Sequence, residues 1–284
     1  MSRKLHITDL ELSGRTVLTR LDLNVPLTES GGVADETRIT RALPTIRRIL
    51  DSGGRAVLAS HLGRPKGTFI KSMSLKPVAA RLSELLGSTV QMAPDCVGDT
   101  SEHMVAALSE GEALLLENLR FHKGETENED DFSKRLGRMG ELYVNDAFGT
   151  AHRAHASTVG VTKHFEQRAM GFLMEEELRN LSKATDAPER PYVAILGGAK
   201  VSDKIGVIEN LMPKVDALLI GGGMSFTFLK AMGREVGDSL LEADRVETAK
   251  ELIEKARASD KKLLLPVDIL VADAVEKGAG TNLV

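Results

Sequence analysis

The stretch SHLGRPKG, residues 60–67, places a histidine, an arginine and a lysine directly after the apolar run RAVLA. Three cationic or protonatable side chains on one turn are typical of an anion site, because guanidinium and ammonium groups bind phosphate and carboxylate. The chain of 284 residues has a formal net charge of −4. Any anion site must therefore be a local concentration of positive charge.

Polar and basic residues also stand where the other predicted strands of the first half end. Ligands of doubly wound sheets bind beyond the carboxyl ends of the parallel strands. The residues at these positions, together with Arg38 at the start of the first predicted helix, are Asp22 and Asn24; His61 and Arg64; Glu117, Asn118 and Arg120; and Asn145 and Asp146, followed by His152, Arg153 and His155. Several arginines at one crevice favour a small, multiply charged anion, and a phosphorylated acid more than a monoanion.

Each of these residues taken alone has a simpler explanation. A single arginine such as Arg64 or Arg120 is more often the partner in a surface ion pair. His61 could be a buried histidine with satisfied hydrogen bonds, and Asp22 could cap a turn or pair with Arg20. We favour a binding site because several independent strands place such groups at the same end.

The second half carries two glycine-rich turns after predicted strands. The segment AILGGAKVSDKIG (194–206) passes from a strand through two glycines into a predicted helix, with Lys200 and Lys204 on one helical face. LLIGGG (218–223) is the second turn, and its alternative explanation is close helix–strand packing. Glycine turns let backbone N–H groups approach phosphate, so we predict a nucleotide site, although both standard nucleotide loops are absent. A phosphorylated acid and a nucleotide together indicate phosphoryl transfer.

The apolar pattern alternates between strands and helices, which is typical of parallel sheets. The predicted strands are 16–25, 55–63, 89–93, 113–120, 141–149, 192–198, 216–223 and 261–272, and the predicted helices are 36–54, 75–87, 100–112, 129–140, 204–215, 224–233 and 246–260. The polar stretch 179–191 interrupts this series. We predict two doubly wound, Rossmann-like α/β domains, residues 1–175 and 191–284, joined by a hinge or linker over 176–190. The second half offers few strands, so we expect its sheet to be incomplete.

The composition excludes several classes of protein. Aromatic residues make up 4% of the chain and tryptophan is absent, which argues against stacking platforms for nucleic acid. No stretch approaches the 18 apolar residues of a membrane span, and the N-terminus lacks the apolar core of a signal peptide. The single cysteine, Cys96, excludes an intramolecular disulfide and a cysteine-based metal cluster. We predict a cytoplasmic protein that binds neither nucleic acid nor membrane.

Six motifs resemble those of phosphoglycerate kinase, in that family's order and spacing over essentially the whole chain. They are TRLDLNVP, SHLGRPKG, LLENLRFHKGE, VNDAFGTAHRAHAST, GGAKVSDKI and LLIGGGMSFTFLK. The resemblance implies reversible transfer of a phosphoryl group from 1,3-bisphosphoglycerate to ADP, bound with Mg²⁺, giving 3-phosphoglycerate and ATP. It also implies a monomer in which the N-terminal domain holds the glycerate and the C-terminal domain the nucleotide.

The resemblance also assigns residues to the two sites. The substrate site would comprise Asp22, Leu23, Asn24, Arg38, His61, Leu62, Gly63, Arg64, Arg120 and Arg153, and the nucleotide site Gly197, Gly198, Ala199, Lys200, Lys204, Gly222 and Gly223. Arg38 would stabilise the transition state and Lys200 would follow the migrating phosphoryl group, so these two are the catalytic candidates. No residue of the chain is assigned as a metal ligand.

The family's chains continue beyond the point that corresponds to residue 284, into further motifs of the nucleotide domain. We therefore expect this chain to be the N-terminal part of a complete enzyme. The alternative is a non-catalytic fragment that binds phosphoglycerate and lacks a competent nucleotide site. A nicotinamide-dependent dehydrogenase on the same type of sheet is a further alternative, and the absent GxGxxG loop disfavours it. An interaction scaffold would leave the cationic strand ends unexplained.

Overall fold

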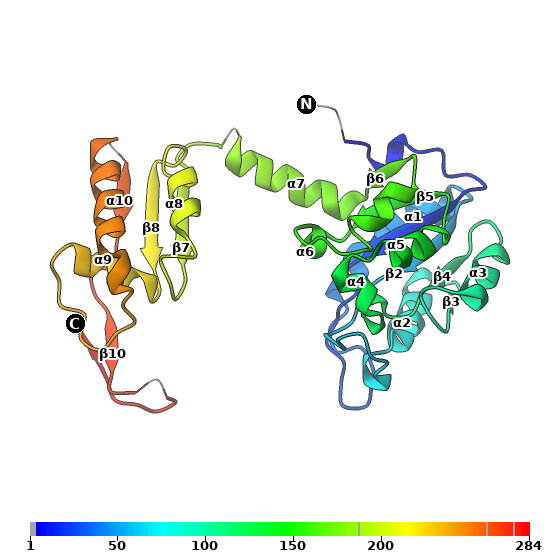
Figure 1. Cartoon of the computed structure of the whole chain (residues 1–284), viewed down its shortest axis with the longest axis horizontal. Coiled ribbons are helices and arrows are strands. Elements are labelled where there is room, and N and C mark those ends of the chain that lie inside the picture. Colours follow the sequence, from blue (N-terminus) through cyan, green and yellow to red (C-terminus); the bar gives the residue numbers. More distant parts are fainter. Residues whose placement is uncertain (1–3, 187, 260, 275) are drawn as a thin grey trace. The chain divides into compact units, whose positions relative to one another are not determined.

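The computed structural model describes residues 4–186, 188–259, 261–274 and 276–284. It divides into two compact units, unit 1 (Met1–Arg179) and unit 2 (Asn180–Val284). Each unit is built on its own parallel sheet, with helices packed against it (Figure 1). The α/β class with parallel sheets, predicted from the alternating pattern, is confirmed.

Unit 1 contains a six-stranded parallel sheet in the order β3-β4-β2-β1-β5-β6. Its strands are β1 (Thr16–Leu21), β2 (Arg55–Ala59), β3 (Val90–Met92), β4 (Ala113–Leu115), β5 (Leu142–Asp146) and β6 (Arg168–Met170). Thr16 pairs with Arg55 and Arg20 with Ala59, so β1 and β2 end level with each other. Strand β6 was not predicted, because three residues are too few to produce a recognisable period.

The helices of unit 1 cover both faces of this sheet. They are α1 (Thr37–Asp51), α2 (Lys76–Leu86), α3 (Asp99–Ala106), α4 (Lys123–Glu127), α5 (Asp130–Gly137), α6 (Phe148–Ala151) and α7 (Phe172–Thr185), with 3₁₀ turns η1 (Ile7–Asp9), η2 (Lys71–Met73), η3 (Leu119–Phe121) and η4 (Gly160–His164). Successive strand residues point to opposite faces. Val17 therefore packs with α1 and α2 in one core, and Leu18 packs with α3 and α5 in another.

Helix α7 occupies part of the segment that we predicted to be a linker. It runs from Phe172 to Thr185, so the division between the two units after Arg179 falls inside a helix. Polar composition does not prevent helix formation, because Glu, Lys, Arg and Leu, which dominate here, are good helix formers.

Unit 2 contains a three-stranded parallel sheet in the order β7-β8-β9. Its strands are β7 (Val193–Gly197), β8 (Ala217–Gly221) and β9 (Lys262–Leu264), and its helices are α8 (Ile205–Leu211), α9 (Met224–Ala231) and α10 (Val246–Ala258), with the 3₁₀ turn η5 (Ala243–Arg245). The three α-helices bury one face of the sheet around Leu218, Ile220 and Phe228. On the opposite face Val193, Ile195 and Leu264 are exposed.

The segment 261–272 differs from its prediction as a single strand. It forms β9 and then, after Pro266, the separate strand β10 (Leu270–Ala272), which pairs antiparallel with β11 (Thr281–Leu283). Proline lacks the N–H needed for the ladder and breaks a strand into two. Within the residues described, no helix is long and apolar enough to cross a membrane.

Candidate functional site: a cationic crevice and two glycine turns

Four adjacent strands of unit 1, in the order β4-β2-β1-β5, deliver the predicted anion-binding residues to one edge of the sheet. Asp22, Leu23 and Asn24 follow β1, the segment His61–Arg64 follows β2, Arg120 lies in η3 after β4, and Arg153 follows α6 after β5. All four strands are parallel, so their carboxyl ends meet on the same side. The sequence prediction therefore gathered residues that the fold does place at one edge.

Hydrogen bonds join three of these loops directly. The Gly63 amide donates to Asn24 Oδ1 at 2.8 Å, and Arg120 Nη1 donates to the Gly63 carbonyl at 2.9 Å. Asn118 brackets the same loop, because its Oδ1 accepts from the Leu62 amide and its Nδ2 donates to the Leu62 carbonyl. The backbone around residue 63 is thus held between the loops that follow β1 and β4.

Helix α1 brings Arg38 to the same crevice. Arg38 Nη1 lies 2.5 Å from Asp22 Oδ2, which makes a direct ion pair. The pair is open to solvent on the Arg38 side, where half of the side chain is exposed. The side chains of Leu23 and Leu62, in contrast, are buried in the core, so only their backbone groups are available to a ligand.

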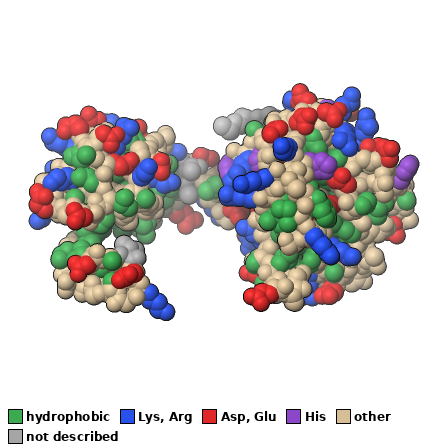
Figure 2. Space-filling view, turned by 60° about the horizontal axis from the view of Figure 1, so that its bottom comes forward, with side chains coloured by type: hydrophobic (Ala, Val, Ile, Leu, Met, Phe, Trp, Pro, Cys, Tyr) green, Lys and Arg blue, Asp and Glu red, His purple; other side chains and the backbone are tan. Residues whose placement is uncertain are grey.

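Three arginines of the crevice have no carboxylate partner within the described part of the chain. They are Arg64, Arg120 and Arg153. Partial burial, followed by the charge of Arg20 and the charges of Arg153 and Arg64, lowers the pKa of Arg120. Its Nε is buried without a hydrogen-bond partner among the described atoms. On the face drawn in Figure 2, Lys and Arg side chains gather beside a histidine on unit 1. Arg64, Arg120 and Arg153 therefore form a group of positive charges without carboxylate partners among the described residues.

His61 lies behind this cluster and contributes no charge to it. Its side chain is buried, and burial, together with the charges of Arg20, Arg120, Arg38 and His155, lowers its pKa to about 2. The imidazole is therefore neutral at any physiological pH. It contributes a polar ring to a site whose charge comes from arginine.

Arg20 also lies among these basic residues, although it was not among the predicted binding residues. It is 1% exposed, and its Nη2 lies 3.1 Å from His61 Nδ1. A charged residue inside the apolar strand TVLTRL was the available signal, because an arginine is almost never fully buried without paired partners. The alternative that Asp22 pairs with Arg20 is wrong, since Asp22 pairs with Arg38.

Several other polar residues at the strand ends hold the loops in place. Glu117 is buried and accepts hydrogen bonds from Ser74, Leu75 and Asn118. Asp146 is buried and accepts from the Met174 amide in the first turn of α7. The rule that residues at strand ends bind ligands therefore identified two kinds of residue: some that face the crevice and others that hold its loops in place.

The two glycine turns of unit 2 pack against each other. Gly197 and Gly221 are paired in the sheet, and the Met224 amide at the start of α9 donates to the Gly198 carbonyl at 2.8 Å. Gly222 has φ +68°, and a Cβ added there would lie 3.0 Å from the Gly198 carbonyl oxygen. A Cβ added at Gly223 would lie 3.2 Å from the Ala199 carbonyl oxygen. The glycines of the second turn therefore do allow close packing against the first turn, as the alternative explanation supposed.

Lys200 and Lys204 do not share a helical face, which corrects the sequence prediction. Residues 201–204 form a turn, and α8 begins only at Ile205. Lys200 is exposed and directly precedes this turn, and Lys204 is half-buried, with its Cε 3.9 Å from the position of a Cβ at Gly198. Both cations thus remain beside the glycine turn despite the different backbone.

Glu242 supports the turn that carries Lys200, and no sequence motif pointed to it. Its carboxylate accepts hydrogen bonds from the Val201 and Ser202 amides and, at 2.6 Å, from Ser202 Oγ. The Ser202 hydrogen bonds, with the Val201 amide and the charge of Lys200, hold the pKa of Glu242 below its usual value. A lone glutamate forty residues away in sequence could not be connected to this turn without the fold.

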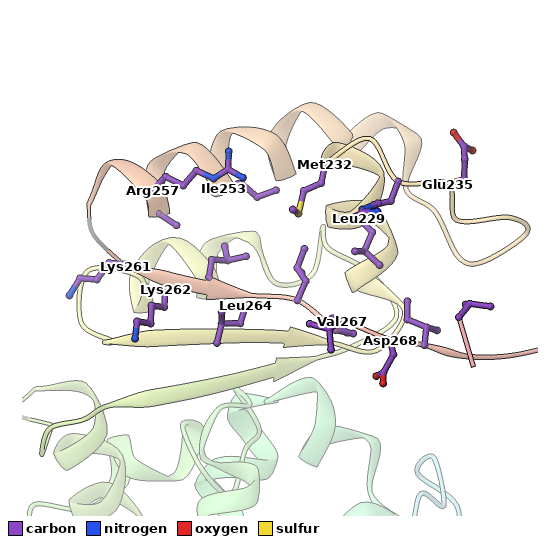
Figure 3. A pocket seen from close by; sticks show the side chains of 17 residues that line it. Leu229, Met232, Glu235, Ile253, Arg257, Lys261, Lys262, Leu264, Val267 and Asp268 are labelled. Carbon is purple, nitrogen blue, oxygen red and sulfur yellow. The ribbon is translucent and has the colours of Figure 1, made fainter. Parts of the chain in front are cut away.

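Unit 2 also has a cavity of about 750 Å³ (Figure 3). Side chains of α9, α10 and β9, among them Leu229, Ile253 and Leu264, line it, and none of the predicted nucleotide residues does.

In unit 1, Asp95, Cys96 and His122 are the one group of three potential metal ligands found among the described residues. Asp95 Oδ1 and His122 Nε2 already pair at 2.7 Å, and burial raises the pKa of the Cys96 thiol.

Comparison with known proteins gives a consistent assignment. A family model of phosphoglycerate kinase matches residues 7–283. The chain is 53% identical to a phosphoglycerate kinase of Chloroherpeton thalassium over 99% of this chain and 70% of that one. It is 54% identical to a cytosolic phosphoglycerate kinase of Triticum aestivum over 97% of this chain and 69% of that one.

Solved structures agree with these relatives. The chain superposes on the phosphoglycerate kinase of Coxiella burnetii with a TM-score of 0.86 at 42% identity, covering 99% of this chain and 70% of that one. For the enzyme of Pyrococcus horikoshii the TM-score is 0.77 at 32% identity, with 94% and 68% covered. The cationic crevice, the paired glycine turns and these matches lead to one conclusion: the chain belongs to the phosphoglycerate kinase family.

Proposed function

We propose that the crevice of unit 1 binds 3-phosphoglycerate and 1,3-bisphosphoglycerate, and that the glycine turns of unit 2 bind ATP and ADP. The observation that carries this proposal is a set of three arginines beyond the carboxyl ends of β2, β4 and β5, namely Arg64, Arg120 and Arg153, none of which has a carboxylate partner among the residues described. A substrate with a phosphate and a carboxylate supplies the negative charge that these side chains lack.

The crevice offers two kinds of group to such a substrate. The unpaired guanidinium groups would bind the phosphate and the carboxylate, each through a rigid fork of donors. Asp22 and Asn24, which follow the neighbouring strand, would bind the hydroxyl group of the glycerate. Arg38 would exchange part of its contact with Asp22 for the reacting end of the substrate and stabilise the transition state there.

Lys200 and Lys204 would hold the nucleotide's phosphates in unit 2. Gly197, Gly198, Gly222 and Gly223 leave the backbone without side chains at this turn, which lets phosphate oxygens approach the amides. Lys200, exposed on a turn braced by Glu242, would follow the phosphoryl group as it moves. Ala199 lies between the glycines and the lysine and would contribute backbone contacts alone.

The transfer requires no general base, because the attacking oxygen belongs to a carboxylate or a phosphate that is already ionised. Catalysis then rests on positioning and on neutralising the charge of the migrating group. The family's Mg²⁺ would arrive with the nucleotide. Asp95, Cys96 and His122 do not fit it, since Mg²⁺ prefers six oxygen ligands and this group offers sulfur and nitrogen.

The remaining predictions concern the surroundings of the reaction. We propose a monomer in the cytoplasm, whose partners are small molecules and which binds neither nucleic acid nor membrane. We also propose the division into a phosphoglycerate-binding domain, residues 1–175, a hinge over 176–190 and a nucleotide-binding part, residues 191–284.

A coupled kinase assay with 3-phosphoglycerate and Mg-ATP tests the proposal on the chain itself. Lys200→Ala, compared with Lys214→Ala at an exposed position of the same unit, exposes any activity of a contaminating host enzyme. We expect turnover that Lys200→Ala lowers about 10²- to 10³-fold, as loss of a charge-stabilising group does. Binding of 3-phosphoglycerate without Lys200-dependent turnover would instead support the non-catalytic alternative.

A further inference from the structure

Four buried polar side chains form a continuous series behind the crevice of unit 1. In order they are Glu125 in α4, Ser157 after α6, Arg20 in β1 and His61 after β2, and each is at most 4% exposed. Buried polar groups need hydrogen-bond partners, and here each finds one in the next. The donor and the acceptor of each hydrogen bond in the series follow from which of its two groups can donate and which can accept.

Glu125 is the acceptor at the far end. Burial alone would raise the pKa of Glu125, but the neighbouring His155, the charge of Arg20 and two hydrogen bonds from Ser157 outweigh burial and hold it below its usual value. The carboxylate is therefore ionised and can only accept. Ser157 donates to it twice, from its hydroxyl to Oε1 at 2.7 Å and from its amide to Oε2 at 2.9 Å.

The hydrogen bond from Ser157 to Glu125 determines how Ser157 interacts with Arg20. Because its hydroxyl hydrogen points to Glu125, the oxygen has only lone pairs left for other neighbours. Arg20 Nε lies 2.8 Å from that oxygen and donates to it. Arg20 also donates to the Leu21 carbonyl through Nη1, so two of its three nitrogens are fixed.

The third nitrogen fixes the tautomer of His61. Arg20 Nη2 lies 3.1 Å from His61 Nδ1, and a guanidinium group has donors but no acceptor. Nδ1 must therefore accept, which leaves the proton of the neutral ring on Nε2. No described residue accepts a hydrogen bond from Nε2, and Nε2 is not among the fully buried atoms left without a partner. This N–H is the one that remains for a ligand.

We propose that Glu125 and Ser157 are positioning residues that, through Arg20, hold His61 as a neutral Nε2–H donor to the bound phosphoglycerate. The inference rests on the proposed function of the crevice. His61 already belongs to the substrate site that the resemblance implies; the inference adds which of its nitrogens carries the proton and which residues fix it, while Arg64, Arg120 and Arg153 supply the charge.

A neutral donor has a consequence for pH dependence. The charged and titratable groups around His61 are Arg20 from β1, Arg120 from η3, Arg38 from α1, and His155 with Glu125 beyond Ser157. Burial disfavours a positive charge on the imidazole ring, and the charges of the neighbouring arginines disfavour it further. His61 should therefore contribute equally to binding from pH 5.5 to pH 8, where an ordinary histidine loses its charge.

Nitrogen-15 NMR of the full chain labelled at histidine tests the protonation state without any ligand. The signals of His61 are identified by their loss in His61→Gln. We expect a neutral Nε2–H pattern that does not change between pH 5.5 and pH 8. A titration of His61 in this range, or a proton on Nδ1, would overturn the proposal.

Ser157→Ala tests the positioning. It removes the acceptor of Arg20 Nε, so we expect His61 to exchange between its two tautomers and the affinity for 3-phosphoglycerate, measured by calorimetry, to fall about tenfold, as for one lost hydrogen bond in a charged network. Ser157→Thr keeps the hydroxyl and should restore both. Ser133→Ala is the matched control, because Ser133 Oγ is equally buried and has no hydrogen-bond partner in the described structure.

A double-mutant cycle separates this role from a general loss of structure. If Ser157 acts through His61, Ser157→Ala should weaken binding much less in a His61→Gln background than in the wild type. Additive losses, or an unchanged Nε2–H pattern in Ser157→Ala, would contradict the positioning role. Failure of the wild-type chain to bind 3-phosphoglycerate would refute the proposed function, while the tautomer measurement tests the hydrogen-bond series by itself.

Discussion

Arg120 is the residue at which burial and unpaired charge meet in this protein. Its side chain is about half-buried, it donates to the Gly63 carbonyl, and its Nε has no partner among the described groups. A guanidinium group cannot lose its proton in response, so the energetic penalty of burying it stays in the folded state until an anion arrives. The crevice is thus prepared for its ligand at the expense of stability.

Replacing Arg120 by alanine should therefore weaken the binding of 3-phosphoglycerate. A hydrogen bond to a charged group contributes about 1.5–3 kcal/mol, so we expect a 10- to 150-fold loss of affinity in isothermal titration calorimetry. Arg138→Ala is the control, since Arg138 is an exposed arginine of the same unit whose Nη1 lies 3.8 Å from Glu102 Oε1. Equal affinities for the wild type and Arg120→Ala would remove Arg120 from the site.

At this scale the sequence pointed to residues at the strand ends and missed Arg20, Glu125 and Ser157, which lie buried among them. Arg64 and Arg120 lie in turns after strands, where a general rule of parallel sheets points to ligands. Glu125 and Ser157 lie 32 positions apart, and their contact exists only because α4 packs beside the loop after α6. Such long-range pairing leaves no period or spacing in the sequence that could be recognised.

Among the elements, α7 depends on a carboxyl group at its first turn. Asp146 Oδ1 accepts from the Met174 amide at 3.0 Å, while Asp146 Oδ2 is buried without a partner in the part of the chain described. Thr45 of α1 accepts from the Phe172 amide next to it. Helix N-termini leave amides that need such acceptors, so β5 and α1 together fix the start of α7.

Asp146→Asn should reveal the burial of this carboxyl group as a pH dependence of stability. Burial raises the pKa of Asp146, so the folded state favours the protonated form, and stability from this group is lost as pH rises through the folded pKa. Asparagine stays neutral. The free energy of unfolding of Asp146→Asn relative to the wild type should therefore rise as the pH increases above about 3.9, the pKa of an unperturbed aspartate.

Urea unfolding followed by NMR signals of unit 1 measures this difference at each pH. Asp131→Asn, at an exposed position of α5, controls for the loss of a carboxyl group. A difference between Asp146→Asn and the wild type that stays flat with pH would show that Asp146 is not held in an unfavourable charged state.

The glycine turn after β8 can be tested in the same way. Gly222→Ala would place a Cβ at φ +68° and 3.0 Å from the Gly198 carbonyl, whereas Gly233→Ala meets a similar φ of +81° and open space. Backbone strain of about 1–2 kcal/mol is common to both. Gly222→Ala should therefore destabilise unit 2 more than Gly233→Ala and should also weaken ATP binding. Equal destabilisation would mean that the two turns do not depend on close contact.

The sequence predicted most elements because their hydrophobic periods are strong, and it was wrong where local signals compete. Helix α1 follows its apolar stripe from Ile39 to Ile49. The segment 261–272 was read as one strand although Pro266 divides it, and Lys200 and Lys204 were placed on one helical face although α8 begins only at Ile205. In the first case the continuous apolar run outweighed the proline. In the second case the spacing of the two lysines suggested a helix that begins later in the chain.

As a whole molecule, the protein consists of two units with separate cores and separate groups of candidate ligand residues. Unit 1 buries both faces of its sheet, and unit 2 buries one face and exposes Val193, Ile195 and Leu264 on the other. The chain spans about 70% of the length of the relatives it matches. Because the candidate ligand residues are separate, we expect each unit to bind its own ligand independently.

The central claim, that unit 1 binds the glycerate and unit 2 the nucleotide, is tested most directly by mapping backbone amide shifts during two titrations. With 3-phosphoglycerate we expect changes confined to residues 22–24, 36–39, 61–64, 118–120 and 147–158. With Mg-ATP we expect changes at residues 197–204 and 222–224. Shifts from 3-phosphoglycerate in unit 2, or from Mg-ATP around the cavity of Figure 3 in place of the glycine turns, would contradict the account.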